Sequence, residues 1–200
     1  MIFVVHRINS VQELKKIPKH FGVEIDLRDK NKKLILQHDP FKDGEDFEEY
    51  LQSYGHGLLI LNIKSERIEF RVLELLKKYN IKNYFFLDSS FPMIYTLSEL
   101  GEKNIAIRFS EFEGIDTILA MKSRINWVWV DCFTQLPLNK QVYKVFKENR
   151  IKTCLVSPEL QGRDSDIKKY KNYLLKEEIQ VDIVCTKIDN VDRWDSSFVR

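Results

Sequence analysis

The segment Gly22-Val23-Glu24-Ile25-Asp26-Leu27 sets two carboxylates into an apolar run, at every second position. Successive side chains of a β-strand point to opposite faces, so Glu24 and Asp26 share one face and the three aliphatic side chains share the other. A strand that is buried on both faces is typical of a parallel sheet. A buried carboxylate pair is costly unless it binds a cation or is fully hydrogen-bonded. The segment therefore predicts a parallel strand with a metal or substrate site on one face.

The rest of the chain alternates short apolar runs with amphipathic segments. Residues 67–79 show the clearest helical pattern, with Ile68, Val72 and Leu75 on one face. The predicted strands are 2–5, 23–27, 34–37, 58–63, 84–87, 105–109, 127–130, 152–156 and 181–185. The other predicted helices are 10–17, 47–53, 92–101, 115–121, 139–149 and 164–177. Buried strands separated by helices indicate an α/β fold with a parallel sheet.

Eight such strands would close a compact (β/α)8 barrel of the TIM type, if residues 34–37 form an excursion beside the second strand. A chain of 200 residues lies at the short end of the range of about 200 to over 400 for such barrels. The alternative is an open doubly wound sheet, whose first turn usually carries glycines for a phosphate. Residues 6–10 contain no glycine, which favours the barrel. No linker or repeat divides the chain, so residues 1–200 are predicted to form a single domain.

The composition, 44% apolar and 31% charged, is that of an ordinary globular protein. A net charge of only +2 provides no field to recruit nucleic acid or an anionic membrane. No apolar run approaches the roughly 20 residues of a membrane span, and the N-terminus does not resemble a signal peptide. Cys132, Cys154 and Cys185 are far apart, which predicts buried thiols in a reducing compartment. The protein is therefore predicted to be cytoplasmic, without nucleic-acid partners.

Function in a parallel barrel gathers at the carboxyl ends of the strands. The polar residues in or after the first four predicted strands are His6, Arg7, Glu24, Asp26, His38, Asp39, Asn62 and Lys64. Paired carboxylates can hold Mg²⁺ or Ca²⁺, which neutralises phosphate charge, and two histidines can divide the proton transfers. Arg7 and Lys64 can stabilise the non-bridging oxygens. The set predicts phosphoryl chemistry; the alternative is a polar centre in which the carboxylates pair with Arg7 or Lys64.

Two charged stretches in the second half, residues 107–113 and 156–163, begin at the ends of predicted strands. They contain Arg108 and Glu159, which we interpret as substrate-binding residues in loops that recognise the alcohol portion of a phosphodiester. Salt-bridged loop structure is an equally good interpretation of the same pattern. Trp127 and Trp129 share a strand face and are predicted to pack beneath helices rather than to stack on a ligand.

The ordered set of motifs resembles the glycerophosphodiester phosphodiesterase family, within the wider group of phosphatidylinositol-phospholipase-C-like barrels. The matching stretches are His6-Arg7, residues 22–27, Leu36-Gln37-His38-Asp39-Pro40, Leu61-Asn62-Ile63-Lys64, Ser89-Ser90-Phe91 and residues 181–186. The resemblance implies an eight-stranded barrel that cleaves a phosphodiester to an alcohol and a phosphomonoester, directly or through a cyclic phosphate. The site residues that it implies are His6 and His38 for catalysis, Glu24, Asp26 and Asn62 for a divalent cation, and Arg7 and Lys64 for the phosphate.

The chain departs from the family pattern at three places. Ile8 replaces the usual glycine after His-Arg, the Glu-Asn loop element is missing, and Asn62 stands where the family has a third acidic ligand. The asparagine carbonyl oxygen can bind a cation but adds no charge, so the metal affinity should be lower. The prediction is a metal-assisted phosphodiesterase for a small glycerol- or sugar-type phosphodiester. A metal-independent cyclising lyase and a catalytically silent barrel that binds a phosphorylated ligand are the alternatives.

Overall fold

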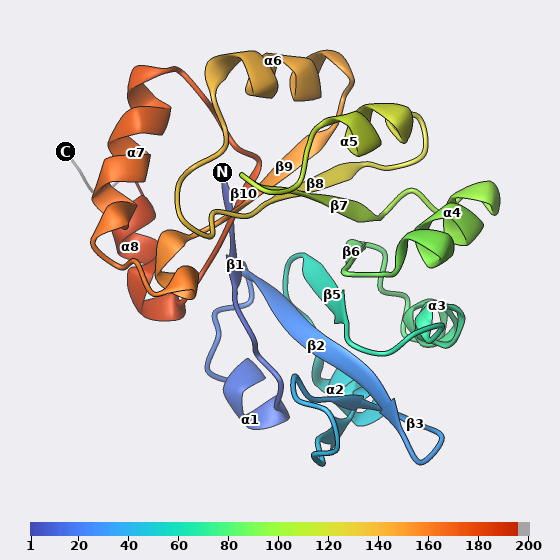
Figure 1. Cartoon of the computed structure of the whole chain (residues 1–200). Helices are drawn as coiled ribbons and strands as arrows, with labels where there is room; N and C mark the ends of the chain where they lie inside the picture. Colours follow the sequence, from blue (N-terminus) through green and yellow to red (C-terminus); the bar gives the residue numbers. More distant parts are fainter. Residues whose placement is uncertain (196–200) are drawn as a thin grey trace. The chain divides into compact units, whose positions relative to one another are not determined.

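The computed structural model describes residues 1–195 (Figure 1). The chain divides into two compact units. One comprises Val5–Ile105, and the other combines Met1–Val4 with Ala106–Arg200, of which the structure describes residues up to 195. The single domain expected from the sequence remains a prediction, and the two units are described separately below.

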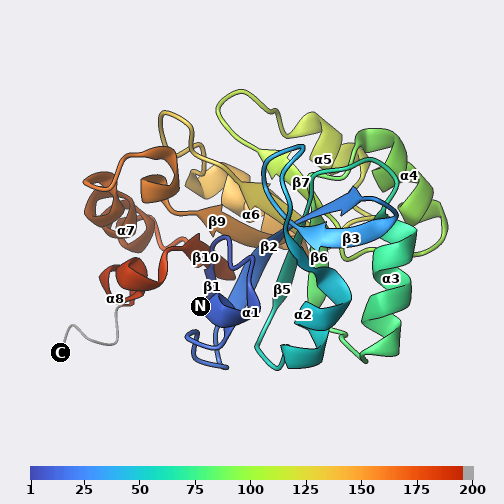
Figure 2. The same ribbon diagram turned by 90° about the horizontal axis from the view of Figure 1, so that it is seen from below.

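The unit Val5–Ile105 contains three parallel strands and a hairpin excursion. Its strands are β2 (Gly22–Lys30), β3 (Lys33–Leu36), β4 (Glu45–Asp46), β5 (Leu59–Ile63) and β6 (Tyr84–Leu87). Its helices are α1 (Val11–Leu14), α2 (Phe47–Ser53), α3 (Glu69–Lys78) and α4 (Phe91–Glu99). Strand β5 pairs in parallel with both β2 and β6. Strand β3 folds back antiparallel to β2 (Figure 2), which confirms the excursion predicted for residues 34–37.

The second unit continues the alternation of strands and helices. Its strands are β1 (Ile2–Val5, whose last residue belongs to the first unit), β7 (Ala106–Phe109), β8 (Trp127–Val130), β9 (Lys152–Val156) and β10 (Ile183–Thr186). Its helices are α5 (Asp116–Ala120), α6 (Lys140–Glu148), α7 (Asp166–Lys176) and α8 (Val191–Trp194), with short 3-10 turns at Pro158–Gln161 and Ile188–Asn190. Strands β7 to β10 pair in parallel in sequence order. The predicted α/β fold is confirmed, whereas closure into an eight-stranded barrel remains a prediction.

Local capping chemistry determines where several helices begin. The Asp46 carboxylate accepts hydrogen bonds from the backbone N–H groups of Glu48 and Glu49, at the start of α2. The Asn139 side chain accepts from the N–H of Val142 at the start of α6. Such side chains satisfy backbone donors that have no partner within the first helical turn. Both helices therefore begin within one residue of the predicted position.

Burial follows the sequence pattern for most apolar residues of the sheet, but α3 also buries Glu69 completely. The aliphatic residues of β2 are completely buried, and all three cysteines are buried and form no disulfide in the described chain. The sequence leaves undecided whether the polar tail of residues 192–200, which contains Trp194, is partly ordered or docks on another subunit. Helix α8 buries Trp194, whose indole N–H donates to Ser157 Oγ at 2.7 Å. Residues 196–200 lie outside the described part. No helix within residues 1–195 is both long and apolar enough to cross a bilayer.

Candidate active site

Strand β2 carries the two predicted carboxylates into the interior of the unit Val5–Ile105. Glu24 is completely buried, and Asp26 is 1% exposed. Glu24 Oε2 accepts the backbone N–H of Arg7 at 2.7 Å, and Glu24 Oε1 accepts the side-chain amide of Asn62 at 2.8 Å. His6 Nε2 lies 3.8 Å from Glu24 Oε2. The end of β1 and strand β5 thus meet at the Glu24 carboxylate.

Asp26 is surrounded by cations and an amide. Asn9 donates its side-chain N–H to Asp26 Oδ2 and accepts the Asp26 backbone N–H, both at 2.8 Å. Arg7 Nε lies 3.4 Å from Oδ2, and Lys64 Nζ lies 3.7 Å from Oδ1. Asp26 is opposite Asn62 in the β2–β5 register, so Lys64, two residues beyond Asn62, leaves the strand close to Asp26. The parallel pairing therefore brings together residues that are about forty positions apart in the sequence.

The electrostatics of this site favour an additional positive charge. Burial, together with the neighbouring Asp26 charge, raises the pKa of Glu24 to about 7, against the lowering effect of the hydrogen bonds from Asn62 and Arg7. A carboxyl group that is removed from water, without enough hydrogen bonds or positive charges to replace the water, is harder to ionise. A bound cation would reverse this effect, because it supplies the missing charge.

The donor set fits a divalent cation that is held through oxygen atoms. Two buried oxygens, Asp26 Oδ1 and Asn62 Oδ1, accept no hydrogen bond from any residue in the described chain. Hard cations such as Mg²⁺ and Ca²⁺ prefer carboxylate and carbonyl oxygens. Within residues 1–195, no three His, Cys, Asp or Glu side chains converge on one metal position. The third protein ligand next to Glu24 and Asp26 would therefore be the neutral Asn62.

A ligand set of two carboxylates and one amide predicts what a third carboxylate at position 62 would do. The substitution Asn62→Asp should increase divalent-cation affinity by roughly tenfold or more, because ligand charge tunes affinity at such sites. In EDTA the same variant should be less stable than the wild type, because three buried carboxylates repel one another. Calorimetric titration with Mg²⁺ and Ca²⁺, and urea unfolding with and without metal, measure the two effects. Unchanged affinity in the folded variant would remove Asn62 from the ligand set.

Each predicted catalytic histidine has an acidic partner. His6 lies beside Glu24, as described above, and its side chain is 22% exposed. His38 Nδ1 lies 2.8 Å from Asp39 Oδ1, and the His38 side chain is 41% exposed. Lys42 and His38 lower the pKa of Asp39 to about 2, so Asp39 stays ionised. An ionised carboxylate at Nδ1 orients the imidazole ring and leaves Nε2 for proton transfer.

Arg28 is a site residue that the sequence interpretation missed. Arg28 Nε donates to the carbonyl of Gln37 at 3.1 Å, and Nη2 donates to the carbonyl of His38 at 2.9 Å. Arg28 therefore ties the backbone at His38 to strand β2. The signal was present in the sequence, because Arg28 continues the alternation of Glu24 and Asp26 and shares their face of β2.

Loss of this anchor should reduce turnover more than binding. Arg28→Ala should lower kcat by roughly 10- to 100-fold with little change in KM, because small misplacements of a catalytic group are that costly. Arg28→Lys should not restore the rate, since a single ammonium cannot reproduce the planar fork that donates to two carbonyls. Steady-state kinetics of both variants provide the measurement. A KM effect without a kcat effect would contradict the assigned role.

Asn9 and Asp88 were also missed as site residues. Asn9 pairs with Asp26, as described above, and Asp88 Oδ2 lies 3.2 Å from Lys64 Nζ. Asp88 follows β6 directly, so its position at a strand end was visible in the sequence. A cavity of about 220 Å³ adjoins Lys64 and is lined in addition by Ser65, Glu66, Asp88 and Ser90, among others. The site therefore has a polar space next to its lysine.

Arg108 and Glu159 belong to the other unit, where each is engaged in an internal network. Arg108 Nη1 donates to Asp131 Oδ2 at 2.6 Å, and Asp131 also accepts from Trp129 and Gln161. Glu159 is 6% exposed and accepts hydrogen bonds from Ser157, Thr186 and the backbone of Lys187. These contacts favour the salt-bridged loop interpretation, and a substrate role for either residue remains a prediction.

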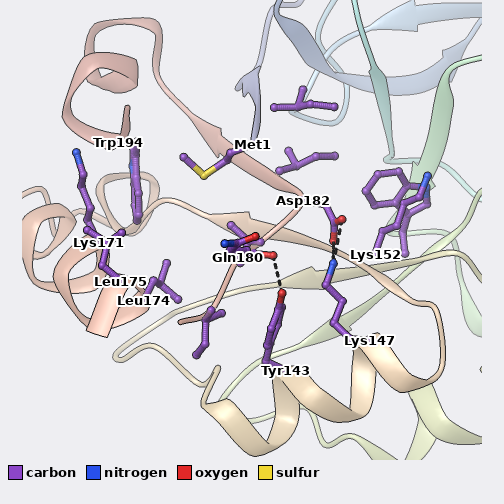
Figure 3. Close-up of a pocket in the computed structure, with 15 residues that line it drawn as sticks. Met1, Tyr143, Lys147, Lys152, Lys171, Leu174, Leu175, Gln180, Asp182 and Trp194 are labelled. Carbon is purple, nitrogen blue, oxygen red and sulfur yellow. Dashed lines mark hydrogen bonds and ion pairs between the residues drawn. The ribbon is translucent and has the colours of Figure 1, made fainter. Parts of the chain in front are cut away.

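A cavity of about 600 Å³ in the second unit carries different chemistry (Figure 3). It lies at the amino ends of β8, β9 and β10, and no histidine lines it. In TIM-type barrels catalysis gathers at the opposite, carboxyl ends of the strands. We therefore place the candidate active site at Glu24, Asp26 and their neighbours.

Comparison with known proteins adds evidence at the level of the fold. No family model matches the sequence, and no curated protein matches it. The structure is similar to a glycerophosphodiester phosphodiesterase from Agrobacterium tumefaciens str. C58, with a TM-score of 0.67, 12% identity and coverage of 97% of both chains. A putative glycerophosphoryl diester phosphodiesterase from the same organism gives a TM-score of 0.67, 11% identity and 93% coverage of both chains.

A third similar structure is a glycerophosphoryl diester phosphodiesterase from Parabacteroides distasonis ATCC 8503. Its TM-score is 0.62 at 14% identity, over 98% of this chain and 86% of that one. Identities this low concern the fold, and function has to be argued from the site. The resemblance predicted from the motifs is thus confirmed: the chain has the fold of the glycerophosphodiester phosphodiesterases.

Proposed function

We propose that this protein is a metal-assisted phosphodiesterase that hydrolyses a small glycerol- or sugar-type phosphodiester to an alcohol and a phosphomonoester. The observation that carries the proposal is the convergence of the buried Glu24 and Asp26 with Arg7 and Lys64. Two carboxylates with an adjacent guanidinium and ammonium can bind both a cation and the phosphate. The fold similarity supports the same substrate class, and the closed barrel predicted from the sequence is part of the proposal.

A divalent cation at Glu24, Asp26 and Asn62 would neutralise charge on the phosphate and orient the diester. Arg7 and Lys64 stabilise the negative charge that develops on the non-bridging oxygens in the transition state. One histidine accepts the proton of the attacking water, whose oxygen forms the new bond to phosphorus. The other histidine donates a proton to the oxygen of the leaving alcohol as its bond to phosphorus breaks.

The substrate is proposed to be small and soluble. The cavity beside Lys64 has a volume of only about 220 Å³, and five of the six side chains that line it are charged or hydroxylated. Such walls suit an alcohol with further hydroxyl groups better than an apolar chain. No nucleic-acid or membrane partner is proposed, because the net charge of the chain is only +2, and a cytoplasmic location remains an expectation.

Release of p-nitrophenol from bis(p-nitrophenyl) phosphate tests the reaction class. The assay is run with Mg²⁺, Ca²⁺, Mn²⁺ or EDTA, and the monoester p-nitrophenyl phosphate serves as the control substrate. We expect metal-stimulated cleavage of the diester and little cleavage of the monoester. Preference for the monoester in the folded protein would contradict the proposal.

A catalytically silent barrel that binds a phosphorylated ligand is the second candidate. The observation in its favour is that Arg7 and Lys64 both pair with Asp26 while Asn62 removes one charge from the cation site. This candidate predicts a thermal shift with glycerol 3-phosphate but no turnover of any diester. The two acid-paired histidines favour the enzyme, because binding alone does not require them.

A further inference from the structure

The 600 Å³ cavity of the second unit lies outside the proposed active site. Its walls come from the amino ends of β8, β9 and β10 and from helices α6 and α7 (Figure 3). Catalysis is not expected at these strand ends. A cavity of this volume falls within the range of about 300 to 1,000 Å³ that small-molecule sites occupy. The residues that line it therefore indicate which class of small molecule it would bind.

Much of the cavity wall is apolar. Trp127 and Trp194 contribute aromatic surface from the buried core. Leu175 and Ile2 also line the cavity, although they are 60% and 48% exposed. Burying apolar surface stabilises a protein or complex by roughly 25 cal/mol for every Å², and an exposed apolar side chain does not gain this free energy. A ligand with an apolar body would recover part of this free energy by covering both side chains.

The charged residues of the wall are predominantly basic. The lining includes three lysines, Lys147, Lys152 and Lys171, and one carboxylate, Asp182. The excess of two positive charges equals the net charge of the entire chain. Figure 3 shows Lys147 and Lys152 beside Asp182, with Lys171 at the other end of the cavity. The cavity is therefore locally cationic in a chain that is otherwise balanced.

Neighbouring groups do not neutralise this excess. Asp182 accepts from Lys147 at 3.2 Å, and it also accepts the backbone N–H and hydroxyl of Thr153. Lys171 Nζ donates only to main-chain carbonyls among its hydrogen bonds in the described chain, those of Arg193 and Asp195. Carbonyl dipoles orient the ammonium group, but they carry no opposing charge.

Lys152 is the lysine best placed for a ligand. Its Nζ lies 5.0 Å from the centre of the Trp127 ring, and no carboxylate of residues 1–195 pairs with it. An ammonium over an aromatic face gains about 0.5–1 kcal/mol at exposed sites. The Lys152 ammonium group is thus held at the apolar wall, and its charge remains available to an anionic ligand.

We propose that this cavity binds a small anionic amphiphile, namely a carboxylate or sulfonate on an apolar body. The anionic head lies at Lys152 and Lys147, and the apolar body covers Trp127, Ile2 and Leu175. The same arrangement repels a cationic head. The proposal does not depend on the phosphodiesterase activity, because both its ligand and its residues differ from those of the candidate active site.

Calorimetric titration with octanoate tests the proposal, with octyltrimethylammonium as the cationic counterpart. We expect saturable binding of one octanoate and none of the cation. Lys152→Met should weaken octanoate binding by roughly five- to tenfold, which corresponds to about 1–1.4 kcal/mol. Lys169→Met is the matched control, because it removes the same charge from an exposed position of α7 outside the cavity. Leu175→Glu, at an exposed position that tolerates a polar side chain, should abolish octanoate binding.

Three outcomes would overturn the proposal. The first is the absence of octanoate binding in the folded wild type. The second is equal binding of the anion and the cation, or equal effects of Lys152→Met and Lys169→Met. The third is a dimer, seen in sedimentation experiments, that Leu175→Glu dissociates and octanoate does not, because a second copy of the chain would then cover this surface.

Discussion

The variants His6→Ala and His38→Ala are each expected to lower kcat for phosphodiester hydrolysis by roughly 10²- to 10⁴-fold, the usual contribution of a positioned acid or base. His6 lies 3.8 Å from Glu24, and His38 lies 2.8 Å from Asp39. Removing either imidazole leaves the carboxylates of the site and the Arg7 and Lys64 side chains in place, so substrate binding should change much less than turnover.

The histidine variants should also remain folded. Both side chains are partly exposed, and substitutions at such positions usually change the free energy of unfolding by less than about 1 kcal/mol. His20→Ala is a suitable control, because His20 is exposed and lies outside the site. The measurement is kcat for an aryl phosphodiester, together with urea unfolding of each variant. Appreciable turnover by the double variant His6→Ala/His38→Ala would exclude the two-histidine mechanism.

The variant Glu24→Gln is expected to weaken divalent-cation binding by more than about tenfold. Mutating residues that only hydrogen-bond to metal ligands already lowers metal affinity by about 10- to 100-fold. Glu24→Gln removes one of the two charges of the proposed ligand set. The metal-free fold should tolerate it, because burial already opposes ionisation of Glu24. Asn62 can turn its amide so that Oδ1, which has no hydrogen-bond partner in the described chain, accepts from the new glutamine.

Titration calorimetry with Mg²⁺, Ca²⁺ and Mn²⁺ measures the effect of Glu24→Gln. Glu66→Gln is the matched control, because Glu66 Oε2 accepts from Ser90 and lies beyond the end of β5. Similar losses in the two variants would indicate a general electrostatic effect, and unchanged affinity in Glu24→Gln would place the cation elsewhere. Either result would contradict the assigned ligand set.

The proximity of Glu24, Asp26, Asn62 and Lys64 could be predicted from the sequence because its determinants are local, while their roles remain predictions. The alternation of Glu24 and Asp26 defines one face of a strand without reference to any other part of the chain. Lys64 follows the same rule relative to Asn62. Most boundaries of the parallel strands were predicted to within two residues, because buried parallel strands are recognisable as short apolar runs between helices. The continuation of β2 to Lys30 and the short strand β4 were not predicted.

The supporting residues could not be assigned in the same way. Asn9 precedes α1 and pairs with Asp26 of β2, 17 positions further along the chain, and Arg28 reaches backbone carbonyls of a different segment. A hydrogen bond to a backbone carbonyl can be made to any residue type, so the sequence does not reveal which residue is the partner. The environment of Trp194 could not be decided for a related reason, because helix α8 is only four residues long and its burial depends on tertiary packing. Short segments carry too little periodicity to predict.

Arg108 and Glu159 illustrate the limit of arguing from strand ends. Arg108 lies near the end of a predicted strand and Glu159 follows one, as the catalytic candidates do, yet the structure engages them with Asp131 and with Ser157, respectively. A polar residue after a strand can serve a ligand or stabilise its own loop. Only the identity and distance of the partners distinguish these roles.

The most direct test of the central claim is hydrolysis of sn-glycero-3-phosphoethanolamine by protein stripped of metal with EDTA, followed by ³¹P NMR as Mg²⁺, Ca²⁺ or Mn²⁺ is added. We expect no turnover in EDTA and restoration by a divalent cation, with a phosphomonoester as the final product. An equal rate in EDTA, an accumulating cyclic phosphate that is never opened, or no turnover with any cation by the folded protein would contradict it.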